Sequence, residues 1–162
     1  MRRVSPIALL ATLASLSHAN SAQGFCQYRD TLYAETTLAE EYRDSHWVVR
    51  ARVVSERFYG PDACVDCPGR LYELEVIETF KGALPRKFAF YTRQNSGGFY
   101  LEQGKAAIGS EWLLFLNPGK WGATDPKAAR AATWVNYSCG QSRRWREINR
   151  EQRATLSRLA RR

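Results

Sequence analysis

Four cysteines are the residues of this chain with the most evident chemistry: Cys26, Cys64, Cys67 and Cys139. Four cysteines allow three pairings, and we expect Cys26 to pair with Cys139 and Cys64 with Cys67. The first bridge would tie the start of the folded chain to its last strand, and closing a loop of that length stabilises a protein by about 4 to 5 kcal/mol on the chain-entropy model. The second bridge would stiffen only the tip of a loop.

The C-x-x-C spacing of Cys64 and Cys67 also suits thiol–disulfide exchange. That chemistry requires one thiolate with a lowered pKa, usually at a helix N-terminus. Here Pro61 and Pro68 flank the pair in a turn-rich stretch between two predicted strands, and the charge of Asp66 would raise the pKa of a thiol. We therefore interpret the pair as a structural bridge and keep a thiol–disulfide exchange enzyme as the alternative.

His46 and three glutamates are the remaining candidates for catalysis or metal binding. His46 has no neighbouring nucleophile at a familiar spacing, and the local cysteine pair has no second pair of Cys or His ligands, so we predict no metal site. Glu73, Glu75 and Glu78 could serve acid–base catalysis, but their spacing is also that of the solvated face and end of a strand. With no complete catalytic set, the sequence predicts a non-enzymatic protein without a cofactor.

The positive charge of the chain is concentrated at its C-terminal end. From Gln141 onward, only Glu147 and Glu151 oppose eight arginines. An arginine-rich amphipathic helix can lie on an anionic membrane surface or bind a polyanion. The candidate contacts are Arg143, Arg144, Arg146, Arg150, Arg153 and Arg158.

The same C-terminal residues have helical spacing. Trp145, Ile148, Leu156 and Leu159 fall on one stripe, and Ser142 is the predicted N-cap of a helix within residues 141–162. We prefer the interpretation in which Trp145 and Ile148 pack on the rest of the domain while the arginines face solvent.

The first residues of the chain have the pattern of an export signal. Arg2 and Arg3 form a positive start, residues 7–16 are mainly apolar, and small residues follow, so we predict cleavage after Ala19 or Ala22. The apolar run is too short for a stable membrane-spanning helix, and no later stretch is long enough. We therefore expect a periplasmic or secreted protein with one domain over 23–140 and a basic tail over 141–162.

The pattern of apolar residues predicts a mainly β domain. Period-two alternation and β-branched residues mark the strands, and turn-forming residues separate them. A short helix is expected before the first strand, because apolar residues there follow helical spacing. The helix is predicted over 30–42 and the strands over 46–55, 71–80, 88–92, 112–116 and 133–137. Five or six short strands without long intervening helices favour a small OB-like Greek-key barrel, with a short N-terminal and an amphipathic C-terminal helix.

Several segments resemble a known family. They are Trp47–Val54, Val76–Gly82, Gly109–Leu116 and the closing Cys139-Gly140, together with Cys26 near the predicted mature N-terminus. These segments resemble the bacterial branch of the TIMP-like, netrin-module-like OB-fold superfamily, over roughly residues 26–139. The resemblance implies an OB barrel. In the animal inhibitors of that superfamily the mature chain begins Cys-x-Cys, and the amine and carbonyl of the first cysteine chelate the zinc of a protease.

This chain departs from the inhibitor motif at its start. Gln27 and Tyr28 follow Cys26 without a second cysteine, and several residues precede Cys26 after either predicted cleavage. We therefore predict an exported, non-catalytic binding or interaction domain, with metalloproteinase inhibition and thiol–disulfide exchange as alternatives. The expected partner is a protein or the envelope surface, not nucleic acid, because the protein is predicted to be exported. We expect a monomer.

Overall fold

The computed structural model describes residues 26–60, 68–93 and 98–161. The predicted signal peptide, Cys64 and Cys67 lie outside these residues. The strands are β1 (Gln27–Tyr28), β2 (Thr31–Leu32), β3 (Trp47–Tyr59), β4 (Gly69–Lys81), β5 (Lys87–Arg93), β6 (Glu111–Pro118), β7 (Thr133–Val135) and β8 (Arg143–Arg144). The helices are α1 (Leu38–Asp44) and α2 (Arg150–Leu159), with 3₁₀ turns η1 (Gly104–Ala106), η2 (Lys127–Ala129) and η3 (Trp145–Glu147).

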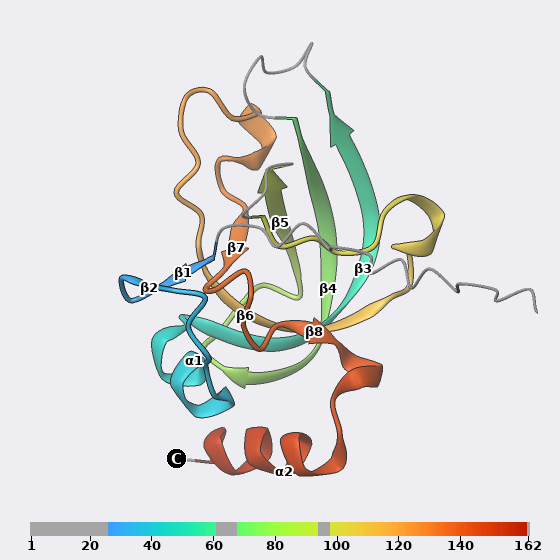
Figure 1. Cartoon of the computed structure of the whole chain (residues 1–162). Coiled ribbons are helices and arrows are strands. Elements are labelled where there is room, and N and C mark those ends of the chain that lie inside the picture. Colours follow the sequence, from blue (N-terminus) through green and yellow to red (C-terminus); the bar gives the residue numbers. More distant parts are fainter. Residues whose placement is uncertain (1–25, 61–67, 94–97, 162) are drawn as a thin grey trace, which may run out of the picture.

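Five strands close a barrel in the order β3-β4-β5-β7-β6, because β6 also pairs with β3 (Figure 1). Neighbouring strands are antiparallel except β5 and β7, which are parallel where Phe90 lies opposite Thr133. The short strand β8 extends the sheet beside β6. The prediction of a mainly β, OB-like barrel with a helix towards each end is confirmed.

In the two longest strands, alternate side chains face the core. Val49, Ala51 and Val53 of β3 are buried in the barrel interior, as are Tyr72 and Leu74 of β4. The β3–β4 pairing contains several register shifts, and such irregularities let long strands bend round a small barrel.

Aromatic rings fill much of the interior. Phe90 lies 6.1 Å from the ring of Tyr72 and 6.3 Å from Phe99, and Phe99 lies 6.0 Å from Trp112, all measured between ring centroids. Two of these contacts are edge-to-face, an arrangement that the quadrupoles of the rings favour. The barrel is therefore a packed core.

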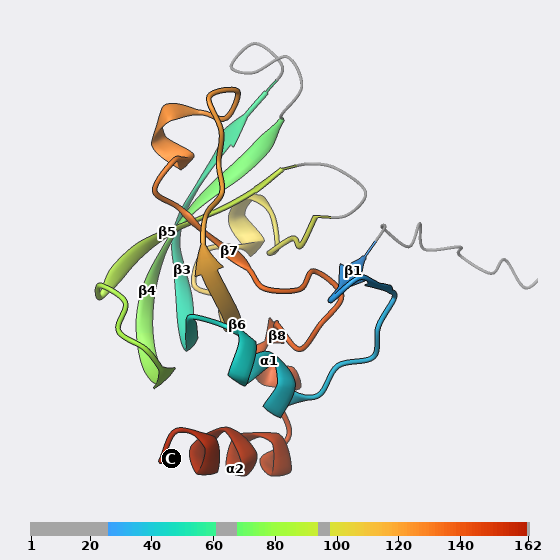
Figure 2. The same ribbon diagram turned by 90° about the vertical axis from the view of Figure 1, so that its left-hand side faces the viewer.

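The two helices pack against one end of the barrel (Figure 2). Val48 and Phe115, which face outward from the barrel, form a second apolar cluster with Ile148 and Leu156. Trp145 packs on this cluster and stacks on Phe80. The prediction that Trp145 and Ile148 pack on the barrel is confirmed.

The predicted N-terminal helix begins too early. Residues 30–32 belong instead to the β1–β2 hairpin, in which Arg29 and Asp30 have positive φ, and residues 33–37 connect the hairpin to α1. Helix α1 starts after Thr37, whose hydroxyl accepts a hydrogen bond from the Glu40 amide while the Glu40 carboxylate accepts one from the Thr37 amide. This capping box fixes the start of the helix.

The predicted start of the C-terminal helix is also wrong. Ser142 is not an N-cap, because its buried hydroxyl instead accepts a hydrogen bond from the Phe115 amide at 3.0 Å. The chain next forms β8 and η3, and α2 begins only at Arg150 with Asn149 as its N-cap. Pairing of β8 with β6 competes with helix formation in this segment and prevails.

The connection between β6 and β7 covers the outer surface of β5. Trp121 from this connection packs edge-on against buried Tyr91, with ring centroids 4.8 Å apart. A bidentate ion pair anchors the connection, since Arg93 of β5 contacts the two carboxylate oxygens of Asp125 at 2.7 and 2.6 Å. This part of the barrel wall is therefore covered by the chain itself.

Candidate functional site

A disulfide joins Cys26 to Cys139, with the two Cα atoms 6.0 Å apart, as the sequence predicts. Cys26 is buried whereas Cys139 is exposed. The rings of Tyr28 and Tyr137, each two residues from a bridged cysteine, have their centroids 5.1 Å apart. The bridge thus attaches the N-terminal hairpin to the chain segment that follows β7.

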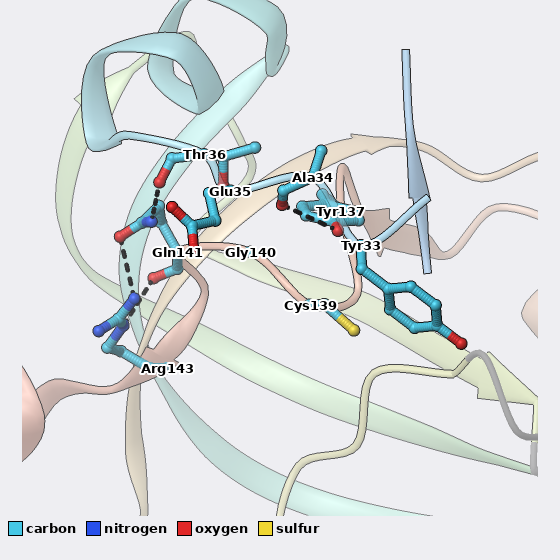
Figure 3. Close-up of a pocket in the computed structure, with 9 residues that line it drawn as sticks. All are labelled: Tyr33, Ala34, Glu35, Thr36, Tyr137, Cys139, Gly140, Gln141 and Arg143. Carbon is cyan, nitrogen blue, oxygen red and sulfur yellow. Dashed lines mark hydrogen bonds between the residues drawn. The ribbon is translucent and has the colours of Figure 1, made fainter. Parts of the chain in front are cut away.

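An open cleft of about 520 Å³ lies next to the disulfide, and we call it the disulfide cleft. One wall is the extended segment between β2 and α1, and the other is the segment between β7 and β8 (Figure 3). The residues that line the cleft are Tyr33, Ala34, Glu35, Thr36, Tyr137, Cys139, Gly140, Gln141 and Arg143.

Hydrogen bonds hold the two walls of the disulfide cleft together. The Tyr137 hydroxyl donates to the Ala34 carbonyl at 3.1 Å, and the Gln141 side-chain amide donates to the Thr36 carbonyl. Arg143 then donates to the Gln141 side-chain oxygen at 2.9 Å. Because the disulfide and these bonds fix the backbone of both walls, a ligand would meet a preformed surface.

A buried carboxyl group lies beneath this surface. Glu41 of α1 is completely buried, and one of its oxygens accepts hydrogen bonds from the Gln141 amide at 2.8 Å and from the Thr36 hydroxyl. The other oxygen, Oε2, has no hydrogen-bond partner among the described residues. A Cβ at Gly140 would come within 2.0 Å of Glu41, so only glycine lets the cleft wall lie so close to this carboxyl group.

Burial raises the pKa of Glu41, against the opposing effects of the Thr36 and Gln141 hydrogen bonds. The folded protein therefore keeps this proton to a higher pH than the unfolded chain does. The contribution of Glu41 to folding stability therefore falls as the pH rises from the ordinary pKa of 4.5 through the raised pKa of the folded state.

We expect Glu41→Gln to remove this decrease, because glutamine does not titrate but retains an oxygen that can accept the Gln141 hydrogen bond. Urea unfolding from about pH 4 to pH 7 measures the effect as the difference between wild type and variant. Glu40→Gln is the matched control, since Glu40 is the adjacent residue of α1 and its pKa is lowered by hydrogen bonds from Thr37. A wild-type minus Glu41→Gln difference that stays constant over this range would contradict the expectation.

The rim of the disulfide cleft carries exposed groups. Tyr33 is 52% exposed, and Leu32, which precedes it in the chain, is 49% exposed. Tyr33 has a φ of 52°, a conformation that is uncommon for an aromatic residue, and its amide is fixed by a hydrogen bond to the Cys26 carbonyl at 2.8 Å. Its side chain points away from the hydrogen-bonded group (Figure 3). The Glu35 carboxylate has no ion-pair or hydrogen-bond partner within the described part of the chain.

The six arginines predicted as one contact surface lie in different parts of the structure. Arg143 lines the disulfide cleft, while Arg144, which is adjacent in the short strand β8, pairs with Glu102 and packs over Trp112. Arg153 packs over Trp145. Of the six candidates, Arg146, Arg150, Arg153 and Arg158 are exposed, and Arg158 donates to the Thr155 hydroxyl. The six arginines therefore do not form one solvated helix face.

A second cleft, of about 410 Å³, lies between the barrel and η3, and we call it the Trp145 cleft. It is lined by Glu111, Arg144, Trp145, Arg146 and Arg153. The three arginines are among the predicted contact residues, whereas Glu111 of β6 was not predicted.

The histidine and the three glutamates considered as candidates for catalysis or metal binding lie outside both clefts. His46 contacts Asn117, with its ring nitrogen Nδ1 3.3 Å from the amide oxygen. Glu75 pairs with Arg86 at 2.9 Å, Glu73 pairs with Lys87 at 3.3 Å, and Glu78 is exposed. Within residues 26–60, 68–93 and 98–161, no three His, Cys, Asp or Glu side chains gather in a way that could hold a metal ion. None of the helices in those ranges is both long and apolar enough to cross a bilayer.

Sequence reasoning missed Glu41, Tyr33 and Glu35 as members of the site. The capping box of Thr37 and Glu40 could have located the start of α1 and left Tyr33 and Glu35 in an extended segment. No local signal distinguishes buried Glu41 from its partly exposed neighbour Glu40, because the burial comes from residues much later in the chain.

The fold and the clefts define a small, disulfide-tied domain of the OB-like barrel class. No protein-family model matches the chain, and no curated protein is significantly similar to it.

Proposed function

We propose that this protein is an exported, non-catalytic binding domain and that it engages a protein partner through the disulfide cleft. The observation behind the proposal is the exposed Tyr33, which a left-handed backbone and the Cys26–Cys139 bridge hold at the rim of a preformed cleft. Backbone outliers of this kind gather at binding sites, and tyrosine is a favoured anchor of protein interfaces. Export rests on the predicted signal peptide, and an oxidising compartment suits the bridge.

The chemistry of the cleft suits a polypeptide with a basic group. Glu35 offers a carboxylate without an ion-pair partner in the described chain, and Arg143 on the opposite wall is held by Gln141. Tyr33 adds exposed aromatic surface to the same cleft, and its neighbour in the chain, Leu32, is also exposed. Such a combination of an aromatic anchor with polar groups is typical of the interfaces of non-obligate complexes.

The geometry at Cys26 does not favour the zinc-chelating mode of the TIMP-like inhibitors. Cys26 is only 3% exposed, and its carbonyl oxygen accepts the hydrogen bond from the Tyr33 amide. Neither feature suits a residue that must reach a metal in another protein. Thiol–disulfide exchange through Cys64 and Cys67 stays a prediction of the sequence, because both residues lie outside the described part of the chain.

Partner capture from the secreted and periplasmic fractions of the source cells tests the proposal. We expect Tyr33→Ser to weaken binding of the captured protein roughly 10- to 30-fold, the effect of removing an aromatic anchor. Ile108→Ser is the matched control, because Ile108 is 50% exposed and does not line the cleft. Capture that is equally strong with both variants, or saturable turnover of a substrate by the purified protein, would count against the proposal.

A further inference from the structure

The Trp145 cleft concentrates guanidinium groups from distant parts of the chain. Arg50 of β3 lies over the Trp145 ring with its guanidinium carbon 4.6 Å from the ring centroid, and Arg153 of α2 lies over the same ring at 4.7 Å. Arg153 is also fixed by a hydrogen bond to the Ile148 carbonyl at 3.0 Å. The indole therefore holds two cations close together on one side of the barrel.

The carboxylate in the cleft is already neutralised. Glu111 accepts hydrogen bonds from Arg50 at 2.9 and 2.5 Å and from Arg52 at 2.7 Å. The Arg52 hydrogen bond has the largest effect, and together these contacts hold the pKa of Glu111 below its ordinary value. Glu111 is therefore ionised and paired. It is not available to neutralise further positive charge.

Positive charge remains in excess around the cleft. Arg144 is paired with Glu102, but Arg146 and Arg153 have no carboxylate partner among the described residues. Burial, and after it the charge of Arg146, lowers the pKa of Arg144. Five arginines, counting Arg50 and Arg52, thus lie near four carboxylates: Glu102, Glu111, the exposed Glu147, and Glu78, which is opposite Arg50 in the pairing of β3 with β4.

We propose that the Trp145 cleft binds a phosphate group, with Arg146 and Arg153 as its principal ligands. Guanidinium forks bind phosphate oxygens in pairs, and Arg153, already oriented by the Trp145 ring and the Ile148 carbonyl, loses little conformational freedom on binding. The phosphate belongs either to a soluble phosphorylated molecule or to an anionic lipid headgroup, since the two present the same oxygens. The disulfide cleft shares no lining residue with this site, so the inference is independent of the proposed protein partner.

Calorimetric titration with inorganic pyrophosphate tests the site directly. We expect saturable binding by the wild type and binding about tenfold weaker or more for Arg146→Gln/Arg153→Gln, because charge-assisted contacts are lost. Arg150→Gln/Arg158→Gln removes the same charge from the same region and is expected to change the affinity by no more than about twofold, through screened long-range attraction alone. Arg146→Gln by itself is the variant that cannot disturb the packing on Trp145, because Arg146 is exposed and makes no such contact.

Vesicles of phosphatidylcholine, with and without phosphatidylglycerol, distinguish the two sources of phosphate. Binding only to vesicles that contain phosphatidylglycerol, with competition by pyrophosphate, would support the site and assign it to a headgroup. Binding of pyrophosphate without vesicle binding would support the site and assign it to a soluble ligand. The inference is overturned if the wild type does not bind pyrophosphate saturably, or if both double variants lose binding equally. Tyr33→Ser should bind pyrophosphate normally, which separates this test from that of the protein partner.

Discussion

Replacing Cys26 and Cys139 by serine should lower the free energy of unfolding by about 4 to 5 kcal/mol. The bridge spans a sequence separation of 113 residues, so its removal frees nearly the whole domain in the unfolded state. Equilibrium urea unfolding of the oxidised wild type and the Cys26→Ser/Cys139→Ser variant measures the difference. A protein of this size commonly has a total stability of only about 5 to 15 kcal/mol, so the variant should lose a substantial part of it.

Unfolding in the presence of a thiol reductant is the control for the disulfide prediction. The wild type should lose a comparable free energy when reduced, whereas the serine variant should change much less on the same treatment. A loss below about 1 kcal/mol in the variant would indicate that the bridge does not constrain the unfolded chain as the entropy model requires.

Phe90→Ala should destabilise the protein by about 3 to 5 kcal/mol. Phe90 is 1% exposed, it contacts the rings of Tyr72 and Phe99, and it lies opposite Thr133 where the parallel pairing of β5 and β7 closes the barrel. Loss of the ring leaves a cavity that the closed sheet cannot readily fill. Urea unfolding at constant pH measures the change.

Ile77→Ala is the matched control for Phe90→Ala. Ile77 belongs to β4 but is 38% exposed, so its truncation should cost within about 0.5 kcal/mol. Equal losses for the two variants would contradict the view that the barrel interior carries the stability.

The sequence was sufficient to predict most of the barrel. In β3, the core residues Val49, Ala51 and Val53 follow the alternation from which the strand was predicted, because the side chains of a strand point alternately to the two faces of the sheet. The pairing of Cys26 with Cys139 was also predictable, since the fold had to bring the chain start to the last strand.

The C-terminal segment could not be predicted in the same way. A strand of two residues, such as β8, contains no period that a pattern could reveal, and its formation depends on pairing with Leu113 and Trp112 of β6. The segment around Trp145 has helical spacing by sequence, yet it forms a 3₁₀ turn before α2 begins. Tertiary pairing here overrides local preference.

The candidate sites depend on contacts between distant residues, and this is why the sequence did not identify them. Glu41 is buried by Gly140 and Gln141, and Arg50 reaches the Trp145 cleft from another strand. Neither relation has a local signature. The arginine-rich tail was therefore interpreted as one surface when it contributes to two.

The register of the two-residue strand β8 against β6 determines which arginine lies in each of the two clefts. Successive strand side chains point to opposite faces, so Arg143 is directed to the disulfide cleft and Arg144 to the Trp145 cleft. A slip of one residue would exchange the two guanidinium groups and alter both recognition surfaces at once. The length of the connection from Cys139 to β8 is consequently under a double constraint, and evolution could not lengthen or shorten it to adjust one surface without changing the other.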